Sequence, residues 1–120
     1  MIKAMVVDDS AFTRRMMRQE LEKLGYAVLE APGGRRALEL YVEQRPAFVT
    51  LDLLMPGMEG DEVLSRLRDI DPEVKVIVCT SNVQSSMRSR MMKLGALGVV
   101  TKPVRMHELL TILTAAVPEA

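Results

Sequence analysis

Acidic, hydroxyl and amino side chains follow or end short apolar segments of this sequence. In chain order they are Asp8, Asp9, Asp52, Thr80 and Lys102. If the segments are strands of one parallel sheet, their carboxyl ends meet at a single edge, where ligands bind in such sheets. Three carboxylates placed together resist ionising unless a cation binds them. Mg²⁺ prefers oxygen ligands and keeps several waters, so the pattern predicts a magnesium site with room for a phosphoryl oxygen.

The apolar segments themselves have the length and composition of buried strands. They are rich in β-branched residues and mostly do not alternate with polar ones, which is typical of strands covered on both faces. Lys75 indicates that one end of the fourth segment contacts water. The five segments cover residues 4–7, 27–29, 47–51, 74–79 and 97–100.

Apolar residues at helical spacing separate these segments. The first helix is marked by Phe12, Met16, Met17, Leu21 and Leu24, and the last by Met106, Leu109, Leu110, Leu113 and Val117. Gly25 can end the first helix in a left-handed conformation, while Pro46 and Pro72 require the second and third helices to end before them. Strand and helix alternate five times. The sequence therefore predicts a doubly wound α/β domain with helices on both faces of a parallel sheet.

Composition narrows the possible functions. A chain of 120 residues with 48% hydrophobic content predicts one domain spanning residues 1–120. Sixteen basic and sixteen acidic residues leave no net charge, which argues against binding nucleic acid or an anionic membrane. Cys79 is the single cysteine, and no apolar run is long enough to cross a bilayer, so we expect a cytoplasmic protein. The scarcity of aromatic residues argues against a flavin carrier.

The ordered set of motifs resembles the receiver domain of bacterial response regulators. The motifs are Asp8-Asp9-Ser10, Asp52 with Met55-Pro56 and Gly60 behind it, Thr80, and Lys102-Pro103. Each is weak alone, but all of them in order at the ends of successive predicted strands form a specific signal. The likeness covers essentially the whole chain. It implies a flavodoxin-like sheet with strand order 2-1-3-4-5 and five helices, and it is greatest for stand-alone chemotaxis-type receivers.

The resemblance also implies roles for the acidic residues. Asp52 matches the phosphoacceptor, the carboxylate that attacks a phosphohistidine and becomes an aspartyl phosphate. Asp9, Asp52 and the backbone carbonyl of Leu54 match the Mg²⁺ ligands, and Asp8 matches a residue that usually acts through water. Because the phosphoryl transition state carries dispersed negative charge, positioning and electrostatics are expected to do most of the catalysis.

Two further residues match groups that contact the phosphoryl oxygens. Lys102 matches the lysine that pairs with the carboxylate, and its bond to Pro103 matches a cis peptide. Thr80 matches the hydroxyl that turns toward the phosphoryl group, although it could also be a strand-end hydroxyl bonded to backbone. The family couples Thr80 to an aromatic residue on the last strand. That position is Val99 here, and Val104 also replaces a frequent aromatic, so the usual relay is not expected.

The function that follows is a phosphorylation-controlled interaction module. The resemblance implies a sensor histidine kinase or a histidine phosphotransfer protein as donor and a protein target in trans. One alternative is a phosphohydrolase with Asp52 as nucleophile, but the acid such enzymes carry two positions later is replaced by Leu54. Another is a receiver-like scaffold that is never phosphorylated. Leu54 and Asn82 occupy the positions that flank the incoming water, and leucine is expected to slow loss of the phosphoryl group.

Several residues also have simpler interpretations. Asp8, Asp9 or Ser10 could cap the helix that follows. The basic residues of the first helix, Arg14, Arg15 and Arg18, most often form a solvated face, with docking to a phosphodonor as the alternative. His107 is expected to face solvent. The helically spaced Met87, Met91 and Met92 are expected in the core.

Overall fold

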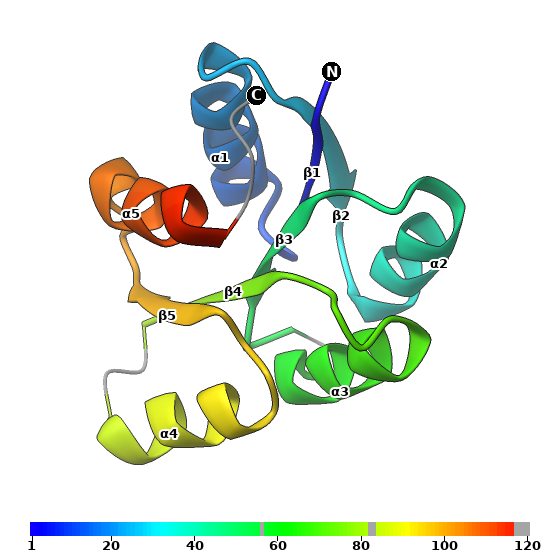
Figure 1. The fold of residues 1–120 in the computed structure, drawn as a ribbon, viewed down its shortest axis with the longest axis vertical. Coiled ribbons are helices and arrows are strands. Elements are labelled where there is room, and N and C mark those ends of the chain that lie inside the picture. Colours follow the sequence, from blue (N-terminus) through cyan, green and yellow to red (C-terminus); the bar gives the residue numbers. More distant parts are fainter. Residues whose placement is uncertain (56, 82–83, 117–120) are drawn as a thin grey trace.

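The computed structural model describes residues 1–55, 57–81 and 84–116, and within them it contains one five-stranded parallel sheet (Figure 1). The strand order is β2-β1-β3-β4-β5. The strands are β1 (Lys3–Val7), β2 (Ala27–Ala31), β3 (Phe48–Asp52), β4 (Val76–Thr80) and β5 (Gly98–Thr101). Both the parallel sheet and its strand order agree with the prediction. Strand β3, which ends at Asp52, lies at the centre and pairs with β1 on one side and β4 on the other.

Helices cover both faces of the sheet. They are α1 (Ala11–Lys23), α2 (Gly34–Gln44), α3 (Gly60–Ile70), α4 (Ser85–Lys93) and α5 (Met106–Ala116). Helices α1 and α5 lie on one face and α2, α3 and α4 on the other (Figure 1). None of the helices in the described ranges has the length and apolar character that a bilayer crossing requires.

The two faces of the sheet form two separate apolar cores. Phe48, Ile77 and Leu109 belong to the core under α1 and α5, whereas Leu51 and Leu64 belong to the core under α2, α3 and α4. Every residue of β3 is buried, as the unbroken apolar segment predicted. The burial of these side chains from water is the main force that holds the helices against the sheet.

Local sequence determines where α1 begins and ends. Ser10 is the N-cap, and its hydroxyl accepts a hydrogen bond from the Thr13 backbone amide at 3.3 Å. Gly25 has φ of 95°, a left-handed conformation that only glycine adopts without strain, and the chain turns there into β2. Of the three candidate caps, Ser10 therefore has this role, which leaves the Asp8 and Asp9 side chains for other partners.

Some of the helically spaced apolar residues are exposed. On α1, Phe12 and Met16 are 75% and 52% exposed, because they line an open pocket between α1 and the start of α5. On α4, Met91 is fully buried and Met92 is 45% exposed. Neighbouring positions on a helix point about 100° apart, so Met91 takes the core position and Met92 does not. The expectation was correct for Met91 and wrong for Met92.

Candidate functional site

The predicted site residues gather at the carboxyl edge of the sheet. Asp52 is the last residue of β3 and Thr80 the last of β4, while Asp8 and Lys102 directly follow β1 and β5. Carboxylate oxygens of Asp8, Asp9 and Asp52 all lie within 4.8 Å of one another. Parallel strands bring these distant residues together because their carboxyl ends share one edge. The group could hold a metal ion, and its all-oxygen donor set suits a hard divalent cation.

Lys102 connects the acidic residues of the site. Its Nζ lies 3.0 Å from Oδ2 of Asp8 and 3.4 Å from Oδ1 of Asp52. The Lys102 backbone amide donates a hydrogen bond of 2.8 Å to the Thr80 carbonyl, and the Lys102-Pro103 peptide is cis. One residue therefore contacts the carboxyl ends of three strands through its side chain and its backbone. This agrees with the placement that the sequence predicted for Lys102.

Two hydrogen bonds hold the turn after β1, one to β2 and one within the turn itself. The Asp8 amide donates to the Ala31 carbonyl of β2 at 3.1 Å, and the Ser10 amide donates to Oδ1 of Asp8 at 2.9 Å. Asp8 is 5% exposed, whereas Asp9 is exposed. The acidic pair thus presents one buried and one accessible carboxylate at the same edge.

Burial and the neighbouring charges both shift the pKa values of Asp52 and Lys102. Burial raises the pKa of Asp52, the Lys102 ammonium lowers it, and the nearby Asp8 carboxylate raises it again, so the pKa ends above its ordinary value. Burial lowers the pKa of Lys102, but the hydrogen bond to Asp8 and the attraction of Asp52 outweigh burial and raise it. With Asp9 included, three carboxylates face one ammonium. The excess negative charge favours binding of a cation.

The remaining residues near the site differ in their burial and in their contacts with Asp52. Thr80 is 1% exposed at the end of β4. The Leu54 amide lies 3.4 Å from Oδ1 of Asp52, and the Leu54 side chain is 69% exposed. The predicted role of the Leu54 carbonyl as a metal ligand remains a prediction. Asn82 and Pro56 lie outside the described residues.

Cys79 is buried, which raises the pKa of its thiol to about 12 and keeps it protonated.

The basic residues of α1 differ from the expected solvated face. Arg14 and Arg18 both bind the carboxylate of Glu30 on β2, at 2.9 and 2.8 Å. Arg14 is mostly buried, with 14% of its side chain exposed, while Arg15 is exposed as expected. Sequence reasoning missed this cluster because the partner lies on another element. The available signal was Glu30 directly after the predicted second strand, followed by the apolar Ala31. His107 faces solvent, as predicted.

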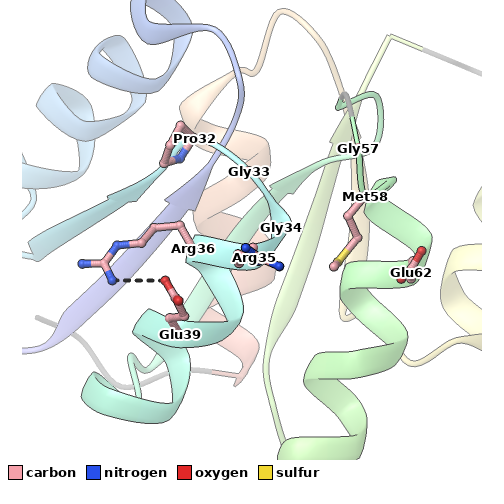
Figure 2. A pocket seen from close by; sticks show the side chains of 9 residues that line it. All are labelled: Pro32, Gly33, Gly34, Arg35, Arg36, Glu39, Gly57, Met58 and Glu62. Carbon is pink, nitrogen blue, oxygen red and sulfur yellow. Dashed lines mark hydrogen bonds and ion pairs between the residues drawn. The ribbon is translucent and has the colours of Figure 1, made fainter.

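A second pocket lies between the starts of α2 and α3. Figure 2 shows Gly33 and Gly34 opposite Gly57 and Met58 across this pocket. A Cβ on Gly34 would lie 2.7 Å from Cγ2 of Val63, so glycine here permits close packing of α2 on α3. Gly33 is the N-cap of α2 and Gly34 its first residue, so this glycine pair begins the helix.

A model of the response regulator receiver domain matches residues 4–114. The chain belongs to this family. The receiver is 40% identical over 102 residues to "Chemotaxis protein CheY" of Thermotoga maritima, covering 84% of this chain and 85% of that protein. It is 35% identical over 107 residues to "Sporulation initiation phosphotransferase F" of Bacillus subtilis, covering 89% and 86%. The resemblance seen in the sequence is thus confirmed.

Solved structures agree with the fold of this receiver. CheY in a CheX-CheY-BeF3-Mg²⁺ complex from Borrelia burgdorferi has a TM-score of 0.91 and 25% identity, covering 98% of this chain and 90% of that chain. A Burkholderia pseudomallei response regulator with a phosphorylated aspartic acid and a calcium ion has a TM-score of 0.87 and 26% identity, covering 94% and 66%. Receiver domains are signalling switches of two-component systems, which places this chain in that functional class.

Val99 shows how this receiver departs from the family's aromatic relay. Its side chain is 7% exposed and packs in the core under α2, α3 and α4. Its carbonyl accepts a hydrogen bond of 2.9 Å from Nη1 of Arg88 on α4. The Arg88 guanidinium therefore connects α4 to the backbone of β5, and the Val99 side chain packs in the core.

Proposed function

We propose that this chain is a phosphoacceptor receiver in which Mg²⁺-dependent phosphorylation of Asp52 switches binding to a protein partner. The observation that carries the proposal is the contact of Lys102 with both Asp8 and Asp52. An ammonium beside the nucleophilic carboxylate is placed to meet negative charge that develops on a transferring phosphoryl group. The presence of phosphorylated and Mg²⁺-containing proteins among the structural relatives supports it.

In the proposed transfer, an oxygen of Asp52 attacks the phosphorus of a phosphohistidine. A P–O bond forms and the P–N bond breaks, so the imidazole leaves as a free base that takes up a proton. Asp52 becomes an acyl phosphate, and Lys102 moves from pairing with a carboxylate to pairing with a phosphoryl oxygen. Bound Mg²⁺ would neutralise charge on the phosphoryl oxygens, and the residues that would hold it are Asp9, Asp52 and the Leu54 carbonyl, with Asp8 acting through water.

Phosphorylation changes the electrostatics of the carboxyl edge. The phosphoryl group adds negative charge and acceptor oxygens at Asp52, which favours a conformation in which the Thr80 hydroxyl meets one of them. Thr80 is linked to the last strand through the Lys102 amide, so a change there reaches β5. The proposed output is altered affinity for a protein target, because a chain without net charge has little general attraction for nucleic acid.

The names of the relatives support the proposed partners. Chemotaxis and sporulation phosphotransfer proteins are both receivers that match most of this chain. We therefore assign a sensor histidine kinase or a histidine phosphotransfer protein as the donor, with donor, receiver and target in the cytoplasm. A phosphohydrolase is less well supported because Leu54 has no proton to give to a leaving group.

The test is incubation of the purified chain with a small acyl phosphate and Mg²⁺, followed by intact mass spectrometry. We expect one phosphoryl adduct on the parent and none on Asp52→Asn, because the amide is a far weaker nucleophile than the carboxylate. Omission of Mg²⁺ should abolish the adduct. Turnover of generic phosphate esters would instead identify a hydrolase, and a parent that stays unlabelled would identify a scaffold.

Leu54 is expected to lengthen the life of the aspartyl phosphate. Its exposed side chain stands two residues after Asp52, where it would shield the phosphorus from attacking water. Leu54→Asn places a polar amide there, so it should lose the label faster than the parent. The measurement is the decay of the adduct by intact mass after removal of the donor. A Leu54→Asn variant that keeps its label longer would contradict the shielding role.

A further inference from the structure

A side chain of α1 contacts the backbone of the acidic turn after β1 and leaves the carboxylates of that turn to other partners. Nη1 of Arg14 donates a hydrogen bond of 2.8 Å to the backbone carbonyl of Asp8. That carbonyl belongs to the peptide unit joining Asp8 to Asp9. Because the peptide unit is planar, holding its oxygen also fixes the direction in which the chain enters Asp9.

Asp9 is the member of the acidic group that most needs such support. The Asp8 carboxylate is held by the Ser10 amide and by Lys102, and the Asp52 carboxylate lies beside Lys102 and the Leu54 amide. Asp9 is exposed, and among residues 1–55, 57–81 and 84–116 no side chain holds its carboxylate. Its position relative to the other two carboxylates is therefore set by the backbone of the turn.

Arg14 is itself fixed by a second contact. Its Nε donates to Oε1 of Glu30 at 2.9 Å, while Arg18 donates to Oε2 of the same carboxylate at 2.8 Å. The hydrogen bond from Arg18 lowers the pKa of Glu30, burial opposes this, and Arg14 lowers it further, so the carboxylate stays ionised at neutral pH. The planar guanidinium uses one nitrogen for Glu30 and another for the Asp8 carbonyl. A lysine ammonium cannot span both partners in this way.

We propose that Arg14, oriented by Glu30, is a positioning residue that places the Asp9 carboxylate for binding of a divalent cation. The inference rests on the proposed function, in that it assigns Mg²⁺ to the group formed by Asp8, Asp9 and Asp52. Residues that orient metal ligands without touching the metal commonly change affinity 10- to 100-fold when they are removed.

The sign of the effect distinguishes positioning from simple electrostatics. Arg14 is a cation near a cation-binding site, so loss of its charge alone would strengthen Mg²⁺ binding. Loss of its hold on the Asp8 carbonyl would weaken binding, because Asp9 would no longer be kept in place. Arg18 offers a matched control on the same helix: it carries the same charge and binds the same Glu30, but the structure shows no contact from it to Asp8.

The experiment measures Mg²⁺ affinity by isothermal titration calorimetry for the parent, Arg14→Met, Arg14→Lys and Arg18→Met. We expect affinity about 10-fold weaker for both Arg14 variants and equal to or tighter than the parent for Arg18→Met. Thermal unfolding without Mg²⁺ reports stability separately, and Arg14→Lys, which keeps the charge, decides the outcome if Arg14→Met does not fold.

Two results would overturn the inference in different ways. If the parent binds Mg²⁺ and both Arg14 variants bind it as tightly as Arg18→Met, the positioning role is wrong and the proposed function stands. If the parent does not bind Mg²⁺ at all, the proposed function fails and the positioning role fails with it.

Discussion

Replacement of Lys102 with methionine is expected to strengthen Mg²⁺ binding and to slow phosphorylation, two effects of opposite sign. The Lys102 ammonium lies 3.0 and 3.4 Å from the Asp8 and Asp52 carboxylates and therefore competes with a metal cation for them. Removal of one like charge beside a bound cation changes binding by roughly 1.4 kcal/mol, or about 10-fold in affinity. The same ammonium is proposed to stabilise the transferring phosphoryl group, and loss of one such preorganised donor typically costs about 100-fold in rate.

Both effects can be measured on one set of proteins. Calorimetry gives the Mg²⁺ affinity, and intact mass at saturating Mg²⁺ gives the rate of labelling by a small acyl phosphate. Lys3→Met is the matched control, because Lys3 is exposed and hydrogen-bonded to Gln44 away from the site. A Lys102→Met variant labelled as fast as the parent would exclude Lys102 from the transfer step.

The Gly60→Ala substitution is expected to destabilise the fold by about 2–3 kcal/mol. A Cβ at Gly60 would lie 2.6 Å from both the Asp52 carbonyl oxygen and the Leu53 Cα, which are backbone atoms of the segment that carries the nucleophile. These atoms cannot rotate away, so α3 must move off the sheet and the hydrogen bond from the Gly60 amide to the Leu53 carbonyl must lengthen. The core under α3 then loses close packing.

Thermal or denaturant unfolding checks this prediction, with an expected fall in Tm of roughly 10 °C. Gly33→Ala is the matched control. Gly33 has an extended backbone, and a Cβ there would have nothing within 4 Å, so its stability should stay near that of the parent. Equal stability for the two variants would show that α3 moves away from β3 at little cost.

The sheet was predictable because burial on both faces leaves a plain signal in the sequence. The apolar segment before Asp52 became β3, whose residues are all buried, and the strand order implied by the motifs is the one observed. The bounds were less predictable. The second segment was expected to end at Leu29, yet β2 continues to Ala31 because Glu30 is neutralised by arginines of α1. A charged residue ends an apolar pattern but does not end a strand when its partner lies on a helix packed against the sheet.

Contacts between different elements also limited how much of the site could be predicted. The positions of Asp8, Asp52 and Lys102 followed from the carboxyl ends of strands, which is a matter of topology. The contact of Arg14 with the Asp8 carbonyl did not, because a backbone acceptor has no signature in the sequence. The sequence also did not indicate that Phe12 is exposed, since helical spacing shows which residues share a face but not how far along the helix the sheet extends.

The central place of β3 determines where this molecule can change shape. Asp52 extends from a strand with hydrogen-bonded partners on both sides and helices above and below, so its backbone has little freedom to respond to added charge. Thr80 ends β4 and Lys102 directly follows β5, which is paired on one side only and forms an edge of the sheet. We therefore expect phosphorylation of Asp52 to act through these two residues on the side of the sheet where β5 forms the edge. The central strand thus holds the reacting carboxylate in place, and the neighbouring strands connect it to the rim of the sheet.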